Sequence, residues 1–350
     1  MNPSVTVLMP VYNGASYLRE ALESVLCQDY DNMQFMVIND GSSDHSGEIL
    51  SQFRDSRLKI LSHTKNVGIA QTLNEGIAMI DSKYIVRMDQ DDVSLPGRLM
   101  RQVGFMEANR NIVMSGTNIK YIGSGIRGRT VFPATSEAIR SQMILKCVIN
   151  HPTVIFRNAS LRRFGWKYIE EGDSVEDYRL WSEITPTHEI ANIADITLLY
   201  RINSNGMTRE AEKKSFERNV SIANVQASIL RNLNYGVSFE LLLKTQSLFQ
   251  GGAGLTLMDF EAITTMYVEI SRVFDERYDV MSYRRLASEI VLFGLKSVEK
   301  GNHALFDGIV NCSRRIFLHP PFSRVGFKQR VPADLFLHLR ELSKRFQSGA

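Results

Sequence analysis

The first half of the chain alternates short runs of apolar, often β-branched residues with longer segments in which apolar residues recur at helical spacing. We predict strands at residues 5–9, 34–39, 58–61 and 84–88, with helices between them. Such alternation is typical of βα units, which build a mainly parallel sheet with helices on its faces. The sequence therefore constrains this half of the chain to an α/β fold.

Polar residues and glycines follow each of these predicted strands. The loops contain the motifs Tyr12-Asn13-Gly14, Asp40-Gly41-Ser42-Ser43-Asp44, Asn66-Val67-Gly68 and Asp89-Gln90-Asp91-Asp92. In open α/β sheets, ligands bind outside the carboxyl ends of the strands, where such loops meet. We expect the four loops to converge on one edge of the sheet and to form one site.

Asp89, Asp91 and Asp92, hereafter the acidic cluster, concentrate negative charge directly after the fourth predicted strand. Neighbouring carboxylates raise one another's pKa unless a cation compensates. Carboxylate oxygens suit Mg²⁺ or Mn²⁺, which bind through one or two carboxylates together with the phosphates of a substrate. We therefore expect an ion between Asp91 and a diphosphate. The alternative is that the acids only cap a helix that begins near Leu95.

Two other loops present groups suited to a planar ligand. Asp40, at the tip of the second strand, is expected to accept a hydrogen bond from an NH or hydroxyl group. Pro10 is expected to end the first strand, and Tyr12 to offer a flat face to a base or ring. The alternative for residues 42–44 is a turn in which one side chain caps the following helix.

Glu176 and Asp177 open a predicted helix at residues 175–184. Asp177 shares a face of this helix with the large apolar side chain of Trp181, so we expect it to be buried. Burial raises the pKa of a carboxyl and suits it to act as a general base. The alternative is that Asp177 only completes a helix-capping motif with Ser174.

Two further polar residues adjoin predicted strands in the middle of the chain. His151 precedes a strand predicted at residues 153–156 and is a secondary candidate for the site. Arg201 follows a strand predicted at residues 196–200. We expect Arg201 either to pair with a phosphate or to form a salt bridge with the acidic cluster.

Beyond Gly206 the apolar residues recur only at helical spacing, which predicts an all-helical region. We therefore expect two domains, at residues 1–206 and 207–350. From residue 301 onward the chain has eight Lys or Arg residues against three acids, with phenylalanines between them. Such a segment is suited to an anionic membrane surface, or its helices pack on the catalytic domain with solvated basic residues.

Composition sets broad limits on location and partners. The net charge of +3 gives no reason to expect nucleic acid as a partner. Cys27, Cys147 and Cys312 lack metal-ligand or disulfide spacing, which favours a reducing compartment. We see no signal-peptide pattern and no apolar run near the ~20 residues that span a bilayer. We therefore expect a cytoplasmic protein, soluble or peripheral at the inner face of the membrane.

In this order, the motifs resemble those of family 2 glycosyltransferases, inverting enzymes of GT-A fold that use nucleotide sugars to build bacterial surface polysaccharides. The resemblance covers about residues 4–205 and leaves the helical region without a motif. The motifs that carry it are Pro10-Val11-Tyr12-Asn13, Asn39-Asp40-Gly41-Ser42-Ser43-Asp44, Asn66-Val67-Gly68, Asn74-Glu75-Gly76, Met88-Asp89-Gln90-Asp91-Asp92, His151-Pro152 and Glu176-Asp177-Tyr178-Arg179-Leu180-Trp181.

The resemblance implies roles for individual residues. Asp89 and Asp91 would hold Mn²⁺ or Mg²⁺, Asp177 would be the catalytic base, and Glu176 and His151 would contact a saccharide or lipid-linked acceptor. We expect the donor to be a UDP-linked sugar. The residues that would bind this nucleoside-diphosphate sugar are Pro10, Tyr12, Asn13, Asp40, Gly41, Asn66, Gly68, Asn74, Asp89, Gln90, Asp91 and Arg201.

The chain departs from the family pattern at two positions. Asn203 stands where many members have a histidine near the diphosphate, and Leu73 where many have an arginine. Two other functions fit parts of the pattern: a module that binds nucleotide sugar without catalysis or serves as a scaffold, and a sugar nucleotidyltransferase. The latter would need a basic, glycine-rich loop after the first strand, and residues 12–16 contain no basic residue.

Overall fold

The computed structural model describes residues 4–123, 127–170, 175–203, 215–249 and 256–275. The chain divides into two compact units, Met1–Arg218 and Asn219–Ala350. The boundary that we predicted at residue 206 lies outside the described residues.

Nine strands of the described residues form one sheet in the first unit. The order β3-β2-β1-β4 occupies one side of the sheet, and these neighbours pair in parallel. Their bounds are β1 Val5–Val11, β2 Met33–Asn39, β3 Leu58–Ser62 and β4 Tyr84–Arg87. All four predicted strands are thereby confirmed, since β-branched and apolar residues that are buried on both faces favour parallel strands.

Pro10 does not end the first strand, as we predicted, but lies inside β1 opposite Ile38. The Leu8 carbonyl faces β4, where it accepts a hydrogen bond from Met88 N, and the Val11 carbonyl faces β2. Because the backbone groups of successive residues point to opposite neighbouring strands, the backbone of Pro10 faces the side of β4. At this position β4 has already ended. The missing N–H of proline therefore breaks no hydrogen bond of the sheet.

The sheet continues beyond β4 in the order β8-β6-β9-β5, with β7 paired to β6. This part is mixed, because β6 and β9 pair in parallel while the other contacts are antiparallel. The bounds are β5 Val93–Ser94, β6 Ile112–Ile122, β7 Arg129–Thr130, β8 Ile155–Arg157 and β9 Glu189–Arg201.

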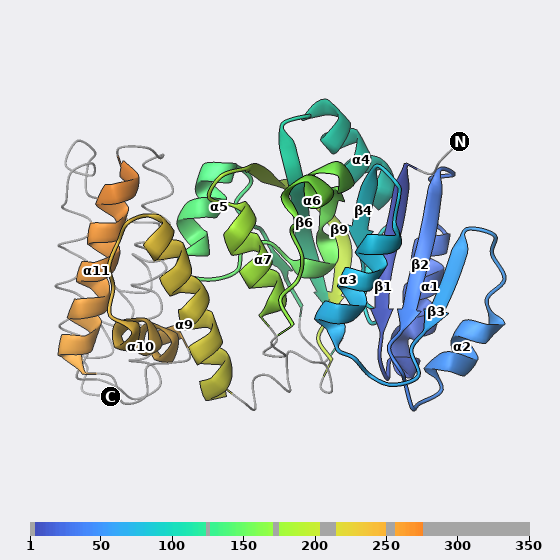
Figure 1. Cartoon of the computed structure of the whole chain (residues 1–350), viewed down its shortest axis with the longest axis horizontal. Coiled ribbons are helices and arrows are strands. Elements are labelled where there is room, and N and C mark those ends of the chain that lie inside the picture. Colours follow the sequence, from blue (N-terminus) through green and yellow to red (C-terminus); the bar gives the residue numbers. More distant parts are fainter. Residues whose placement is uncertain (1–3, 124–126, 171–174, 204–214, 250–255, 276–350) are drawn as a thin grey trace, which may run out of the picture. The chain divides into compact units, whose positions relative to one another are not determined.

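Helices cover both faces of the sheet, so the first unit has three layers (Figure 1). A core on one face joins side chains of β1, β2 and β4 to α1 (Ala15–Leu26), α2 (Ser46–Gln52) and α4 (Arg98–Ala108). On the other face lie α3 (Ile69–Met79), which packs on β1 and β2, and α6 (Asn158–Phe164), which packs on β8. This arrangement confirms the predicted α/β class.

The buried face of α1 includes Leu18 and Leu22, because the helix turns its most apolar stripe to the core. One local prediction in this unit needs correction. Thr153 belongs to a short 3-10 helix, η1 (His151–Thr153), and the strand begins later. The Thr153 hydroxyl bonds to the carbonyl oxygen of Asn150, a local contact that favours a turn over a strand.

The remaining helices of the first unit are α5 (Ser136–Met143) and α7 (Glu176–Ile184). The next helices along the chain are α9 (Ser215–Asn232), α10 (Phe239–Phe249) and α11 (Leu257–Asp275), as the helical spacing predicts. The basic segment beyond residue 301 lies outside the described residues. No helix in the described part of the chain is long and apolar enough to cross a membrane.

Candidate active site

The order of the strands reverses direction between β1 and β4. From β1 the chain moves through β2 to β3 in one direction, and β4 returns to the opposite side of β1. Ligands of open α/β sheets bind outside the carboxyl ends of the strands at such a reversal. The loops after β1 and β4 are joined there: Tyr12 N donates to Gln90 Oε1 at 2.8 Å, and Gln90 Nε2 donates to Tyr12 O at 2.9 Å.

This pairing requires a glycine at position 14. A Cβ atom there would lie 2.3 Å from Gln90 Oε1, closer than any ordinary contact. The side chain of Gln90 thus substitutes for a strand neighbour and fixes the loop of the acidic cluster to the end of β1. Tyr12 itself is 46% exposed, so its ring is free to contact a ligand.

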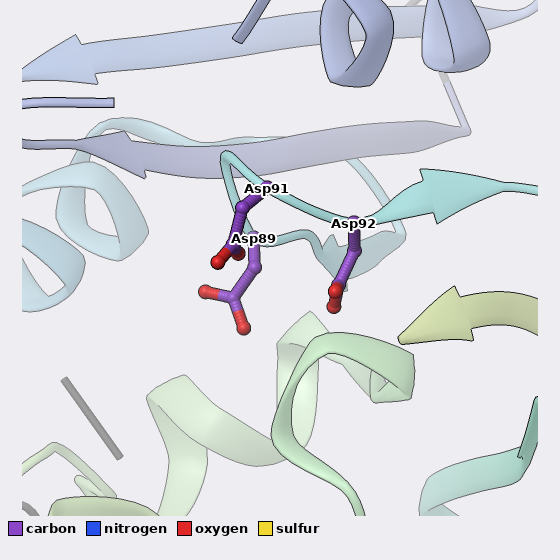
Figure 2. A group of neighbouring side chains, drawn as sticks. All are labelled: Asp89, Asp91 and Asp92. Carbon is purple, nitrogen blue, oxygen red and sulfur yellow. The ribbon is translucent and has the colours of Figure 1, made fainter. Parts of the chain in front are cut away.

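The three carboxylates of the acidic cluster point into a common space (Figure 2). One oxygen atom from each of Asp89, Asp91 and Asp92 lies within 4.8 Å of the other two. Burial, followed by the charge of Asp89, raises the pKa of Asp91 to about 6. The same two causes raise the pKa of Asp92 well above its usual range.

This arrangement fits a divalent cation. Close carboxylates that disfavour one another's ionisation gain most from a bound cation, and three oxygen donors suit Mg²⁺ or Mn²⁺. Asp92 Oδ2 is buried without a hydrogen-bond partner among the described residues. Its other oxygen, Oδ1, accepts a hydrogen bond from Arg201 N at 2.8 Å and does not cap a helix. The capping alternative for the cluster therefore does not account for Asp92.

Asn203 also reaches the acidic cluster, where a hydrogen bond from its side chain lowers the pKa of Asp91. The departure from histidine at this position thus leaves a neutral polar group against a carboxylate that we predicted to bind metal.

Arg201 lies against the acidic cluster, but its salt bridge is with Glu20 rather than with a carboxylate of the cluster. Its Nε donates to the carbonyl oxygen of Asp91 at 2.8 Å, and its Nη2 lies 2.5 Å from Glu20 Oε2. The guanidinium also lies 4.4 Å from the centre of the Tyr17 ring. Arg201 therefore holds the loop of the acidic cluster, and contact with a phosphate stays a prediction.

Arg87 is a residue of the site that the sequence analysis missed. It lies at the end of β4, its side chain is 3% exposed, and it forms an ion pair with Asp89. Its charge also acts on Glu176 and lowers the pKa of Asp177. The signal was a basic residue inside an otherwise apolar strand, where a charge needs a partner.

Asp40 is buried at the end of β2 and accepts three hydrogen bonds. Val67 N donates to Oδ1 and Gly68 N to Oδ2, both at 2.9 Å, and His63 Nδ1 lies 2.8 Å from Oδ1. Gly41 follows with a φ of +65°, and a Cβ there would lie 2.4 Å from the carbonyl carbon of Lys65. Asp40 and Gly41 thus bring two of the predicted loops, those after β2 and β3, into contact.

The loop after β1 meets the loop after β2 in the same way. Asn13 N donates to Ser42 Oγ at 3.0 Å, and Asn13 Oδ1 accepts from Ser43 N at 2.9 Å. Asp44 receives N–H groups from the starts of two helices, Ala15 N and Ser46 N, each at 2.9 Å. The predicted turn and capping role of residues 42–44 is therefore present alongside any role in binding.

Asn74 and Asn66, two residues expected to bind the donor, differ in their environments. Asn74 exchanges hydrogen bonds with the backbone of Tyr168, with its Nδ2 donating to Tyr168 O and its Oδ1 accepting from Tyr168 N, each at 2.8 Å. Asn66 is exposed in the loop after β3. Asn74 thus anchors the segment of Tyr168, and donor contact by either asparagine stays a prediction.

Glu176 and Asp177 form the first turn of α7. Burial, followed by the charge of Asp177, raises the pKa of Glu176 to about 7. Burial also raises the pKa of Asp177, whose Oδ2 lies 4.0 Å from Cys147 Sγ. Two adjacent carboxyls with raised pKa values are suited to take up a proton near neutral pH.

His151 lies beside this pair in a group of aromatic side chains. Its Nε2 is 2.9 Å from Tyr168 Oη, and its ring meets that of Trp181 edge-on at 5.9 Å. Burial lowers the pKa of His151 far below its usual range, so the imidazole is neutral and its 3.9 Å approach to Glu176 is not an ion pair. Tyr168 is a further residue that spacing alone did not reveal.

Comparisons with known proteins agree with this fold. A family model described as Glycosyl transferase family 2 matches residues 6–167. An uncharacterised glycosyltransferase of Haemophilus influenzae is 30% identical over 215 residues, which cover 58% of this chain and 67% of the relative. The Escherichia coli UDP-Glc:alpha-D-GlcNAc-diphosphoundecaprenol beta-1,3-glucosyltransferase WfgD is 27% identical over 212 residues, 60% of this chain and 81% of that protein.

Two solved structures share the fold. Residues 1–349 of Staphylococcus aureus TarS, in complex with UDP, superpose with a TM-score of 0.52 at 16% identity and cover 99% of this chain and 92% of that one. The mannosyltransferase PcManGT of Pyrobaculum calidifontis, in complex with GDP-Man and Mn²⁺, has a TM-score of 0.53 at 15% identity and covers 91% and 88%.

The three-layered first unit has the GT-A fold of these structures, and the family model and the named relatives define its class as glycosyltransferase. The chain belongs to glycosyl transferase family 2.

Proposed function

We propose that the protein is an inverting glycosyltransferase that moves a sugar from a nucleoside-diphosphate sugar, UDP-linked, to a hydroxyl group of a saccharide or lipid-linked acceptor. One observation carries the proposal: Arg87 forms an ion pair with Asp89 of the acidic cluster, and its charge also lowers the pKa of Glu176 and Asp177 at the start of α7. A site for a leaving diphosphate and a site for proton uptake are therefore close enough to serve one reaction.

Asp177 is the proposed base. Its raised pKa makes its carboxylate a better proton acceptor than an exposed aspartate, and its Oδ1 is held by Tyr178 N at 2.7 Å. Asp177 takes the proton of the acceptor hydroxyl while that oxygen attacks the anomeric carbon, and the bond to the diphosphate breaks. A single in-line displacement inverts the configuration at that carbon. Glu176 and His151 line the acceptor side.

Asp89 and Asp91 are the proposed ligands of Mn²⁺ or Mg²⁺. When bound, such an ion supplies positive charge that stabilises the leaving diphosphate. The protein itself fixes these side chains: Arg87 pairs with Asp89, and Gln90 joins their loop to Tyr12.

The nucleotide side of the site lies at the ends of β1 and β2. Tyr12 exposes a ring on which a base can stack, and Asp40 has an acceptor position left beyond its three hydrogen bonds. We assign the remaining contacts with the nucleotide sugar to residues of the neighbouring loops. UDP as the nucleotide is supported by the complex of TarS with UDP and by the name of WfgD, whereas PcManGT is described with GDP-Man.

A lipid-linked acceptor and a role in polysaccharide biosynthesis are supported by the name of WfgD, which acts on a diphosphoundecaprenol substrate. We assign contact with the inner face of the membrane to the basic residues beyond residue 301. This part of the proposal rests on the sequence.

The test is a screen of nucleotide sugars for hydrolysis and for transfer to lipid-linked saccharides, with the wild type, Asp177→Asn and Glu183→Gln. Glu183 lies exposed on the same helix and serves as the control. We expect Asp177→Asn to lower the rate of transfer by about a hundredfold or more while nucleotide binding persists, and Glu183→Gln to have no effect. Transfer that survives unchanged in Asp177→Asn contradicts the role of the base. Nucleotide binding without turnover by the wild type favours a non-catalytic module.

A further inference from the structure

The imidazole of His63 lies between two carboxylates at the edge of the sheet that carries the site. Its Nδ1 is 2.8 Å from Asp40 Oδ1, and its Nε2 is 2.9 Å from Glu75 Oε2. Asp40 follows β2 and Glu75 belongs to α3. The backbone of His63 is fixed as well, because its N–H donates to the carbonyl oxygen of Asn39 at 2.9 Å.

Only a doubly protonated ring satisfies both contacts. A neutral imidazole carries hydrogen on one nitrogen, so its other nitrogen would turn a lone pair toward a carboxylate oxygen. The hydrogen bond to Asp40 and the charge of Glu75 raise the pKa of His63, against the opposing effect of burial. These two carboxylates are the charged groups that act on the ring, and Lys65 on the same loop is exposed.

The hydrogen bond from His63 also affects how many acceptor positions of the Asp40 carboxylate remain for a ligand. An ionised carboxylate has about four positions for accepting hydrogen bonds. His63 and Val67 N occupy Oδ1, and Gly68 N occupies one position of Oδ2. The side chain of Asp40 is 4% exposed, so its charge is buried and needs a fixed counter-charge. His63, when protonated, provides such a cation in contact with Asp40.

We propose that protonated His63 is a positioning residue for nucleotide recognition, which holds Asp40 as a carboxylate with one acceptor position left for an N–H group of the base. The proposal rests on the proposed function, in which Asp40 contacts the base. Uracil and guanine have a ring N–H on their pairing edge, whereas cytosine and adenine have a lone pair there. The protein therefore binds uridine or guanosine diphosphates and rejects those of cytidine and adenosine.

The bridge makes nucleotide affinity depend on pH. Below the raised pKa of His63 both carboxylates are bridged. As the pH rises through that pKa, the ring loses a proton, one contact becomes repulsive, and Asp40 loses its counter-charge. Affinity for UDP should therefore be high on the acid side and fall toward alkaline pH.

Calorimetry with UDP and Mg²⁺ between about pH 6.5 and about pH 9 tests this, with CDP and ADP as comparison nucleotides. We expect the wild type to lose about tenfold in affinity for UDP across this range, the size expected for one charge-assisted hydrogen bond. His63→Gln should bind UDP weakly at every pH, without this dependence.

Glu75→Gln is the matched variant. Its amide can donate to a neutral Nε2 while Nδ1–H still donates to Asp40, so the bridge no longer requires a charged ring. We expect this variant to keep its affinity for UDP at alkaline pH, and the ring signal of His63 in NMR to titrate at a lower pH than in the wild type.

The outcomes separate the two levels of the proposal. Failure of the wild type to bind any nucleoside diphosphate overturns the proposed function. UDP binding that is identical in the wild type, His63→Gln and Glu75→Gln at every pH overturns the role of His63 alone, as does a His63 signal that titrates equally in the wild type and Glu75→Gln.

Discussion

The buried guanidinium of Arg98 donates a hydrogen bond to the carbonyl oxygen of Pro152 at 2.7 Å. The same nitrogen, Nη2, also donates to the carbonyl oxygen of Arg87 at 2.7 Å. Arg98 lies in α4, so this one side chain joins the end of β4 to the turn that carries His151. It thereby connects the side of the site that holds the acidic cluster with the side that holds the proposed base.

Arg98→Met should destabilise the protein by about 3 kcal/mol, because it keeps the bulk of the side chain but leaves two buried carbonyl groups without donors. Burial already lowers the pKa of Arg98 to about 9, which shows how little solvent reaches it. Arg101→Met is the control, since Arg101 is exposed on the same helix, and its effect should stay within about 0.5 kcal/mol. Urea unfolding measures both. Equal stabilities would contradict the buried connection.

Glu176→Gln should make the protein more stable at pH 8 and less active. The folded pKa of about 7 lies above the usual 4.5, so stability is greatest below the unfolded pKa and falls as the pH rises through 7. Removing the buried charge should recover up to about 3 kcal/mol at pH 8 and little at pH 4. Urea unfolding at the two pH values checks this, with Glu23→Gln, exposed on α1, as the control. A gain that is the same at both pH values would be inconsistent with the raised pKa.

Asp91→Asn should abolish the effect of Mn²⁺ on UDP binding, because it removes a charged ligand from the acidic cluster. We expect the wild type to bind UDP at least about tenfold more tightly with Mn²⁺ than without it. That difference should shrink as the pH falls through about 6, since protonated Asp91 cannot bind the ion. Calorimetry measures the affinities, and Asp195→Asn, an exposed site, is the control. Equal affinity of the wild type with and without Mn²⁺ would remove the ion from nucleotide binding.

Gly41→Ala should lower both stability and affinity for UDP. Its φ of +65° is strained for alanine, and the added Cβ would lie 2.6 Å from Asn66 N, so the loops after β2 and β3 must separate. We expect a loss of about 2 kcal/mol.

Gly47→Ala is the matched control for that variant. Gly47 lies in α2, where the nearest atom to an added Cβ is 3.8 Å away, so the change should stabilise by about 0.5 kcal/mol. Thermal unfolding and calorimetry with UDP measure both variants. Comparable behaviour of the two would show that the close approach at Gly41 is unimportant.

The residues that the sequence predicted well are those whose signal is local. Alternation of apolar runs located β1 to β4, and the concentration of carboxylates in residues 89–92 indicated a group that the structure brings together within 4.8 Å. The start of α7 at Glu176 was predicted by helical spacing in the same way. Each of these patterns lies within a few residues of the chain, where backbone geometry and charge repulsion act directly.

The residues that were missed or misplaced depend on distant partners. Pro10 was expected to end a strand, but it fits within β1 because β4 stops short beside it. Glu20, the salt-bridge partner of Arg201, was not predicted, because it lies 181 residues away in the chain. Sequence spacing contains no information on contacts of that separation.

By itself, the sequence determined the α/β class, the family and the chemistry of the loops, because apolar periodicity and ordered polar motifs are properties of short segments. The tertiary structure alone decided how these groups act on one another. Burial raises the pKa of Asp91, Asp92 and Glu176. His63 bridges Asp40 and Glu75 across two elements. Ionisation and counter-charge depend on distance and on exclusion of water, and both are set only when the segments pack together.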